Sequence, residues 1–401
     1  MKILNVSYSD LFGGAAKSAF RIHKCLLNSN INSKILVVKK ISKDKNVIEY
    51  QNYFEKLKFK LKNYFFIIIS KFYKSNPVSF NFFNSPLLKI INNYEADFVN
   101  LHWINSETIS IEDIGKINKP LIITLHDMWF FTGIENYIMD NNNYWKNYQT
   151  LKNTNVISCF FLKKKIRNIR NFYVITPSRW MSKLAKSSKL MNKSLIKTIP
   201  YPLDTEFYKP NKKYPKKSNA IVRILFVAFG NISEKRKGLD LLLNSLNLIN
   251  KKNFELTIVG NSKKQPIFDN NFKIKNIGMI KDDAHLIKIY NATDIVAIPS
   301  RVDNLPNVGL ESHSCGKPII AFKIGGMSDI VDNNKTGYLV KPFCLKTFSQ
   351  KLEILIKNYN LRKKFSYNAR KKALRKWNEK YIAKKYYSYL KQIINIESKK
   401  L

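Results

Sequence analysis

Two acidic residues follow a buried-strand pattern in the second half of the chain. The stretch PSRVDNLPNVGLESHSCGKPIIAF, residues 299–322, places Asp303 in a polar loop and Glu311 about one turn into a helix that begins near Asn307. A ligand there would meet the carboxyl end of a parallel strand and the free N–H groups of a helix N-terminus. A carboxylate at this place suits a neutral hydroxyl, such as that of ribose. Alternatively, Glu311 only stabilises the first turn of its helix.

A basic loop, NISEKRKG, follows another buried-strand pattern at residues 223–230. Lys237 before Gly238 provides a cation, a close backbone approach and a helix N-terminus, which together suit a diphosphate. Arg236 is a second cation beside it. The alternative is an ordinary solvated basic surface. Gly13 and Gly14 form a similar turn before the first helix, although a glycine pair alone is more often just a tight turn.

His126 and Asp127 end a third buried run, PLIITLHD, at residues 120–127. A histidine and a carboxylate at a strand end can serve as acid, base or hydrogen-bonding groups toward a bound substrate. On general grounds a single histidine at such a place is more often structural. The residues alone leave both readings open.

Short apolar runs alternate with helical patterns along the whole chain, which predicts parallel sheets covered by helices on both faces. The pattern breaks near 200–222, where four prolines and a polar, basic stretch indicate a linker. We therefore expect an N-terminal domain at 1–200, a linker at 201–222 and a C-terminal domain at 223–377. The helix expected at about 378–401 has an apolar face that could pack back on the N-terminal domain.

The chain of 401 residues carries a net charge of +42, with 60 lysines and 10 arginines. This charge is compatible with a polyanionic partner or an anionic membrane. Proteins that recognise nucleic-acid sequences usually favour arginine, so its scarcity argues against such a function. It favours a solvated lysine surface that results from compositional drift. The four cysteines lie far apart and are expected to be reduced thiols. The chain begins directly with a strand pattern, so we expect no cleavable leader.

A Lys- and Phe-rich stretch at about 53–85 is expected to contain an amphipathic helix. The most apolar run within it, YFFIIIS at 64–70, is too short to span a bilayer. We therefore expect a soluble or peripheral protein.

The acidic stretch resembles the signature of the retaining family-4 glycosyltransferases of GT-B architecture. Asp303 and Glu311 are separated by seven positions, SCGKPIIAF completes the match, and IGGMSDIV and NNKTGYLV follow as in such enzymes. The resemblance implies an α/β fold with two facing Rossmann-like domains. It also implies that Glu311 binds the ribose of a nucleotide-sugar donor. Asp303 and the loop after it would hold the transferred sugar, the loop residues being Asn304, Leu305, Pro306, Asn307 and Val308. The family more often has Glu at the place of Asp303.

The same resemblance extends to the diphosphate site. It implies that Lys237 and the backbone at Gly13 and Gly14 contact the donor phosphates. An arginine that the family carries before this lysine is replaced by Asn231, and Arg236 is the candidate to supply the missing charge.

The first half resembles the subgroup that builds bacterial exopolysaccharides and lipid-linked oligosaccharides. This likeness rests on DLFGGAAKSAFRIHKCL, VNLHWIN and INKPLIITLHDMWFFTG. It implies that His126 contacts the donor sugar or the transition state, and that Asp127 orients the imidazole or binds acceptor. The following loop, GIENYIMDNNNYWKNY, departs from the subgroup, so the acceptor does not follow from the resemblance.

These features predict a hexosyltransferase that moves a sugar from a nucleotide sugar to a glycan or lipid-linked glycan, with retention, in cell-surface polysaccharide biosynthesis. We expect no cofactor, no metal and no nucleic-acid partner. The expected location is the cytoplasm, with peripheral contact at the inner face of the cytoplasmic membrane. The alternatives are a GT-B nucleotide-sugar epimerase and a non-catalytic basic protein that binds polyanions or membranes.

Overall fold

The computed structural model describes residues 1–50, 53–71, 78–138, 156–211, 221–250, 253–261, 271–280 and 282–400. The chain divides into two compact units. Unit 1 contains Met1–Pro202 and Ile382–Leu401, and unit 2 contains Leu203–Tyr381. The linker expected at 201–222 crosses this division, and its residues 212–220 lie outside the described part.

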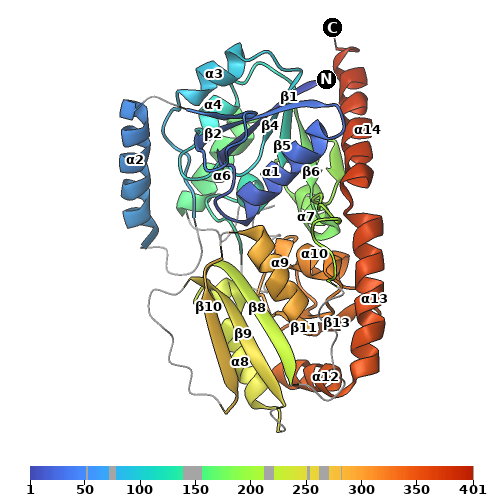
Figure 1. The fold of residues 1–401 in the computed structure, drawn as a ribbon. Coiled ribbons are helices and arrows are strands. Elements are labelled where there is room, and N and C mark those ends of the chain that lie inside the picture. The colour runs from blue at the N-terminus through green and yellow to red at the C-terminus, as the bar shows by residue number, and fades with distance from the viewer. Residues whose placement is uncertain are drawn as a thin grey trace. The chain divides into compact units, whose positions relative to one another are not determined.

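Unit 1 is built on a seven-stranded sheet in the order β3-β2-β1-β4-β5-β6-β7, and every neighbouring pair is parallel (Figure 1). Its strands are β1 (Lys2–Ser9), β2 (Asn32–Lys39), β3 (Val47–Glu49), β4 (Phe98–Leu101), β5 (Leu121–Thr124), β6 (Phe172–Thr176) and β7 (Ile196–Thr198). The register pairs Lys2 with Asn32 and Ile3 with Phe98. The central strands are buried on both faces, which explains why most of their residues are apolar.

Helices connect and cover these strands. They are α1 (Gly14–Leu27), α2 (Tyr53–Lys71), α3 (Leu87–Asn93), α4 (Ile111–Ile114), the 3-10 turn η1 (Trp129–Phe131), α6 (Val156–Asn168), α7 (Arg179–Ser187) and α14 (Glu379–Glu397). The amphipathic helix expected within 53–85 corresponds to α2. None of the described helices is both long enough and apolar enough to cross a bilayer.

Helix α14 packs on unit 1 although it is the last element of the chain (Figure 1). The hydroxyl of Tyr389 accepts a hydrogen bond from Val174 N at 3.2 Å and donates to Leu195 O at 2.7 Å. The ring of Tyr386 is buried beside it. Tyr389 thus ties α14 to β6 and to the residue that precedes β7.

Unit 2 repeats the same principle with a six-stranded parallel sheet in the order β10-β9-β8-β11-β12-β13. Its strands are β8 (Val222–Asn231), β9 (Phe254–Asn261), β10 (Lys273–Gly278), β11 (Ile295–Ile298), β12 (Ile319–Phe322) and β13 (Gly337–Val340). Its helices are η2 (Lys235–Lys237), α8 (Leu239–Asn247), α9 (Asp283–Ala292), α10 (Asn307–Ser314), α11 (Met327–Ile330), α12 (Leu345–Lys357) and α13 (Tyr359–Lys376).

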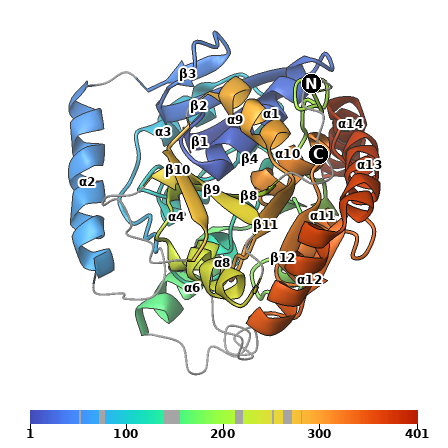
Figure 2. The same cartoon turned by 60° about the horizontal axis from the view of Figure 1, so that its bottom comes forward.

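The helices of unit 2 cover both faces of its sheet. Apolar side chains of α8 and α12 join one core cluster with β8, and these two helices lie side by side in Figure 2. Helix α10 lies on the opposite face, where a Cβ on Gly309 would come within 3.6 Å of Ile298 Cδ1 and 2.7 Å of Ile330 Cδ1. Each unit is therefore a doubly wound, Rossmann-like α/β domain. That the two domains face each other across a cleft stays a prediction.

Candidate active site

The connections of the unit 2 sheet reverse direction between β8 and β11, which are neighbours at its centre. In an open parallel sheet the loops that leave two such strands diverge, and a crevice opens between them at their carboxyl ends. The loop after β8 carries Arg236 and Lys237, and the loop after β11 carries Asp303. The topology thus places the three charged residues expected from sequence at the point where this fold binds ligands.

Gly238 allows these two loops to touch. Its φ of +74° lies in the left-handed region, and a Cβ there would come within 2.1 Å of Pro299 O. The backbone of Arg301 donates from its N–H to Arg236 O at 2.8 Å. The loop glycine expected from the sequence is therefore required both by conformation and by close approach.

Two half-buried cations and one buried carboxylate form ion pairs that join the two loops. Lys237 Nζ donates to Asp303 Oδ2 at 2.7 Å, and the guanidinium of Arg236 lies 3.4 Å from the same oxygen. Burial favours the neutral carboxyl, but the charges of Lys237 and Arg236 outweigh it and lower the pKa of Asp303. The pKa of Lys237 is lowered, mainly by burial and secondly by the positive charge of Arg236. The site holds two cations against one shared carboxylate, with Glu234 bound to the far side of Arg236 at 2.7 Å.

The backbone of Asp303 is held from a third direction, by the glycine turn after β12. Gly326 N–H donates to Asp303 O at 3.0 Å. Gly325 has a φ of +56°, and a Cβ there would come within 2.0 Å of the same carbonyl oxygen. The expected donor-binding loop continues from Asp303 as a buried segment, since Asn304, Leu305 and Pro306 are buried.

Residues Asn307 and Val308 form the half-buried first turn of α10. The first N–H groups of a helix lack intrahelical acceptors and carry the positive end of its dipole. This turn follows directly from the loop that holds Asp303. It can therefore present backbone donors toward a ligand in the crevice.

Glu311 lies one turn further along α10 and is 3% exposed. Its Oε2 accepts a hydrogen bond of 2.8 Å from the hydroxyl of Tyr290, a fully buried residue of α9. Burial and the charge of Glu311 raise the pKa of Tyr290 well above its usual value, so the phenol keeps its proton. Sequence reasoning missed Tyr290, because an aromatic residue inside a helix pattern is ordinarily a core residue.

Asn231, which stands where the resemblance expects an arginine, ends β8. Its Oδ1 accepts a hydrogen bond from Ser233 N at 2.9 Å, so the side chain shapes the start of the basic loop. Arg236, by contrast, lies beside Lys237 and Asp303. Of the two, Arg236 is the one that brings a cation to the crevice.

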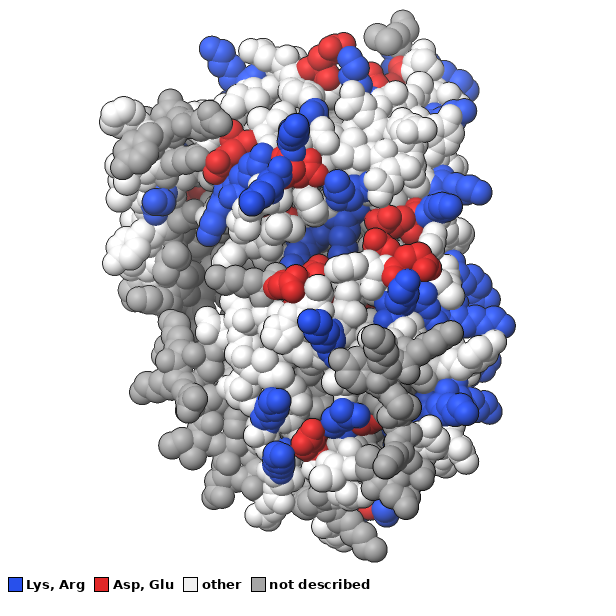
Figure 3. All heavy atoms as spheres, viewed as in Figure 1, with Lys and Arg blue, Asp and Glu red and all other residues white. Residues whose placement is uncertain are grey.

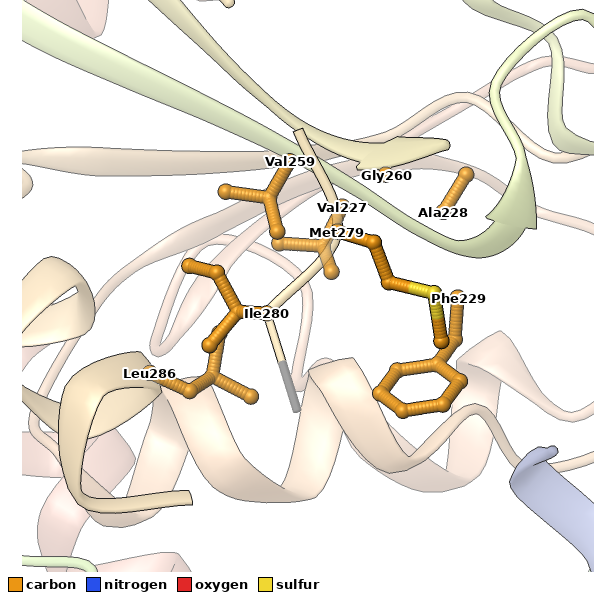
Figure 4. A pocket seen from close by; sticks show the side chains of 8 residues that line it. All are labelled: Val227, Ala228, Phe229, Val259, Gly260, Met279, Ile280 and Leu286. Atoms are coloured by element: carbon orange, nitrogen blue, oxygen red, sulfur yellow. The ribbon is translucent and has the colours of Figure 1, made fainter. Parts of the chain in front are cut away.

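An apolar pocket lies beside the same edge of the sheet (Figure 4). It is formed by the carboxyl ends of β8 and β9, the segment after β10 and the start of α9. The residues that line it are Val227, Ala228, Phe229, Val259, Gly260, Met279, Ile280 and Leu286. This pocket was not expected from the sequence.

In unit 1 the connections reverse between β1 and β4. Gly13 follows β1 with a φ of +92° and stands directly before α1, which begins at Gly14. No atom of the described residues lies within 4 Å of a Cβ built on Gly13. The glycine is therefore favoured by its positive φ and not by a lack of space for a side chain. The glycine turn expected from sequence therefore leads into a helix N-terminus at the carboxyl edge of this sheet.

His126 belongs to a chain of buried polar groups. Its Nε2 lies 2.9 Å from His102 Nδ1, and its Nδ1 lies 2.9 Å from the hydroxyl of Tyr201. The chain continues from His102 Nε2 to Asn5 Oδ1 at 2.9 Å. Both ring nitrogens of His126 therefore bind protein groups, and the imidazole is oriented by His102 and Tyr201. The sequence signal for His102 was its place in VNLHWIN, whereas nothing singled out Tyr201.

Asp127 is also committed to unit 1. Its Oδ2 accepts from Trp103 Nε1 at 3.1 Å and from Asn105 Nδ2 at 3.2 Å, and its Oδ1 accepts from Trp129 N at 3.1 Å. These bonds fix the turn that follows β5. The acceptor role expected for Asp127, and the donor contact expected for His126, stay predictions. Residues 139–148 of the atypical loop lie outside the described part.

The buried imidazoles make a testable contribution to acid sensitivity. Burial lowers the pKa of His126 to about 3 and that of His23 to about 4, and it holds that of His102 well below the usual range. A folded-state pKa below the unfolded one means that the unfolded chain takes up protons first as pH falls below about 6.5. We expect the free energy of unfolding to fall by several kcal/mol between about pH 6.5 and about pH 4, at about 1.4 kcal/mol per proton and pH unit.

Urea titrations over that range measure this dependence. His126→Gln removes one of the protons and should make it shallower, whereas His285→Gln, which replaces an exposed histidine of α9, should leave it unchanged. Equal slopes for the wild type and His126→Gln would contradict the expectation.

Among the described residues, no three or more His, Cys, Asp or Glu side chains are grouped so that they could hold a metal ion. The four cysteines are free thiols, of which Cys25 and Cys315 are buried.

Comparison with known proteins finds one family model that matches the region that holds the acidic site. Residues 211–372 match the glycosyl transferases group 1 family. This match covers Lys237, Asp303 and Glu311 and leaves out unit 1.

Individual relatives agree with this family. The capsular polysaccharide biosynthesis glycosyltransferase CapM of Staphylococcus aureus is 27% identical over 186 residues, which cover 44% of this chain and 49% of CapM. The D-inositol 3-phosphate glycosyltransferase of Rhodococcus erythropolis is 37% identical over 71 residues, which cover 18% of this chain and 16% of the relative. The chain thus matches about half or less of the length of these relatives.

Solved structures are similar over almost the whole chain. Sucrose-phosphate synthase from Thermosynechococcus elongatus matches with a TM-score of 0.67 at 15% identity, covering 99% of this chain and 100% of that one. Anabaena HepE, solved with UDP and glucose, matches with a TM-score of 0.64 at 18% identity, covering 98% and 99%. The group 1 region and unit 1 together therefore have the fold of GT-B glycosyltransferases, as expected.

Proposed function

We propose that this protein is a glycosyltransferase that moves a hexose-type sugar from a nucleotide-sugar donor to a glycan or lipid-linked glycan acceptor, with retention. The observation that carries the proposal lies in the loops after β8 and β11 of unit 2, where Lys237 and Arg236 share one carboxylate, Asp303, within the group 1 region. Two cations beside a helix N-terminus suit a diphosphate. A carboxylate beside them suits sugar hydroxyls.

In this proposal each residue has a definite task. Lys237, Arg236 and the first N–H groups of α10 neutralise the diphosphate as it becomes the leaving group. Asp303 and the loop from Asn304 to Val308 hold the transferred sugar. Glu311, oriented by Tyr290, accepts hydrogen bonds from the ribose hydroxyls. The apolar side chains of Figure 4 would pack against the flat face of the nucleobase.

Unit 1 would contribute the backbone at Gly13 and Gly14 to the donor phosphates. We further propose that His126, which His102 and Tyr201 orient, contacts the transferred sugar. In this proposal the transfer needs no metal. A role in cell-surface polysaccharide synthesis is supported by the likeness to CapM. We place the protein in the cytoplasm, in peripheral contact with the inner face of the membrane.

Donor binding is the first test. HepE has been solved with UDP and glucose, so UDP-glucose is the first candidate in a panel of nucleotide sugars. A true donor at a hundredfold excess over its Kd should stabilise the fold by about 2.7 kcal/mol, seen as a rise in Tm. Free glucose at the same concentration is the control. A panel in which no nucleotide sugar raises the Tm would contradict the proposal.

Product analysis then separates the reaction classes. A transferase releases nucleoside diphosphate only when an acceptor is present and attaches the sugar to it, whereas an epimerase converts the donor and releases no nucleotide. Anomeric NMR signals of the product distinguish retention from inversion, and activity after treatment with EDTA tests metal independence.

A further inference from the structure

Helix α2 of unit 1 has apolar residues on two opposite sides. On its inner side Phe59 is 3% exposed and belongs to the unit 1 core, and Ile69 packs against that core. On its outer side six large apolar or aromatic side chains are 42–74% exposed: Phe54, Leu57, Leu61, Tyr64, Phe65 and Ile68. We call these six the outer face of α2. A helix that only covers a core would have polar residues on this side.

The spacing of the outer face is that of one continuous stripe. At about 100° per residue, its six positions fall within an arc of about 100° centred opposite Phe59. The stripe runs the length of the helix, from Phe54 in its first turn to Ile68 near its end. In both Figure 1 and Figure 2, α2 lies at the outer edge of unit 1. The stripe is therefore a long apolar surface whose side chains are largely exposed.

Lysines border the stripe on both sides. Around the helix axis, Lys60 lies beyond Tyr64 at one border of the stripe, and Lys62 lies beyond Phe65 at the other border. Lys60 is exposed, and Lys62 is half-buried with its ammonium bound to Asn84 O at 3.2 Å. Lys60 thus carries positive charge beside the apolar stripe, whereas the ammonium of Lys62 lies over the rings of Phe59 and Phe83.

The charge of the chain decides which occupant fits. A second copy would bring a second net charge of +42 and its own flanking lysines against this surface. An anionic bilayer instead offers an apolar interior for the stripe and negative headgroups for the lysines. On the face visible in Figure 3, lysine and arginine side chains are spread over the surface with acidic residues among them. The long-range attraction to an anionic surface therefore comes from many residues and not from a single cluster.

We propose that the outer face of α2 is a membrane-docking surface that lies in the interface of an anionic lipid bilayer. The helix would rest parallel to the membrane, with the six side chains among the acyl chains and the lysines at headgroup level. Tyr64 suits this depth, because its ring is apolar and its hydroxyl reaches water. The inference deepens the proposed function: a protein held there works where lipid-linked acceptors lie.

Vesicle binding tests this surface without donor or acceptor, so its outcome is independent of the proposed reaction. Sedimentation of the full chain with vesicles of equal parts phosphatidylglycerol and phosphatidylcholine should recover bound protein, and vesicles of phosphatidylcholine alone should recover much less. The triple variant Leu57→Gln, Leu61→Gln, Phe65→Gln should lower the partition coefficient at least about tenfold, because it removes three exposed apolar groups. Lys60→Glu should lower it about tenfold at low salt.

A matched control removes three apolar side chains of comparable exposure from unit 2. Leu248→Gln, Ile354→Gln, Leu374→Gln replaces residues that are 40–56% exposed, and it should bind vesicles like the wild type. Unchanged far-UV circular dichroism and Tm would show that the α2 variant folds. The proposal fails if that folded variant binds as strongly as the wild type. It also fails if ultracentrifugation shows that the outer face mediates self-association, or if both kinds of vesicle bind equally.

Discussion

Glu311→Ala should weaken binding of the nucleotide-sugar donor about a hundredfold to a thousandfold and lower sugar transfer at least as much. The side chain is buried in the second turn of α10 and is held in one orientation by Tyr290. In the proposed complex its carboxylate accepts hydrogen bonds from two ribose hydroxyls. Hydrogen bonds to a charged group contribute about 1.5–3 kcal/mol each, and two of them account for the expected loss.

Glu311→Gln separates charge from shape. The glutamine amide keeps an acceptor for the Tyr290 hydroxyl and fills the same space, so the fold should keep its stability while donor affinity falls to an intermediate value. Glu311→Ala, in contrast, leaves that buried hydroxyl without this partner, which costs about 1–3 kcal/mol of folding free energy. Combining Glu311→Ala with Tyr290→Phe removes the orphaned hydroxyl and should recover stability but not donor binding.

Isothermal titration calorimetry with the donor found by thermal shift measures the affinities. Glu353→Gln, on the surface of α12, is the matched control and should bind donor normally. Near-normal affinity in a folded Glu311→Ala variant would remove Glu311 from the site.

The sequence predicted the strands that are buried on both faces and missed those at the edges. Strands β1, β4, β5, β8, β11 and β12 are mostly apolar because helices cover both their sides. Strands β3 and β7 have three residues each, and β10 reads KIKNIG with mostly exposed or half-buried side chains. Short, polar edge strands have the composition of loops, so periodicity could not detect them.

The site was predictable in its ingredients but not in its contacts. That Lys237 and Asp303 each follow a buried strand could be read from the chain, since parallel strands end at a common edge. Their ion pair joins residues 66 positions apart and depends on the close approach at Gly238. For His126 the sequence predicted a contact with a ligand. In the structure its two ring nitrogens lie within hydrogen-bond distance of His102 and Tyr201. Such long-range partners follow from the packed sheet and not from local pattern.

Lys237→Ala should lower the turnover number for sugar transfer about a hundredfold to a thousandfold, because the leaving diphosphate loses the cation nearest to Asp303. Removing one preorganised group that stabilises developing charge typically has an effect of this size. Initial rates at saturating donor measure it. Lys235→Ala, which removes an exposed lysine from the same loop, should leave turnover within about twofold if the effect belongs to the Lys237 position and not to the charge of the loop.

The same substitution should also destabilise unit 2, for a different reason. Without Lys237 the buried carboxylate of Asp303 keeps only Arg236 as a cation, and an undercompensated buried charge is costly. The lowered pKa of Asp303 should rise toward its usual value in the variant. In the wild type, the lowered pKa of Asp303 adds to the free energy of unfolding at any pH above the pKa that this carboxyl has in the unfolded chain. This contribution is lost as the pH falls through the pKa of the folded protein. The variant should therefore show a smaller loss of stability on acidification.

The double variant Lys237→Ala, Asp303→Ala distinguishes the two effects. Removing both charges eliminates the uncompensated carboxylate, so the Tm should recover part of what the single variant loses. Transfer should stay as low as in the single variant or fall further, because the double variant lacks both the diphosphate cation and the sugar-binding acid. Recovery of transfer together with stability would mean that the pair only supports the fold, and the assignment of Lys237 to the leaving diphosphate would be wrong.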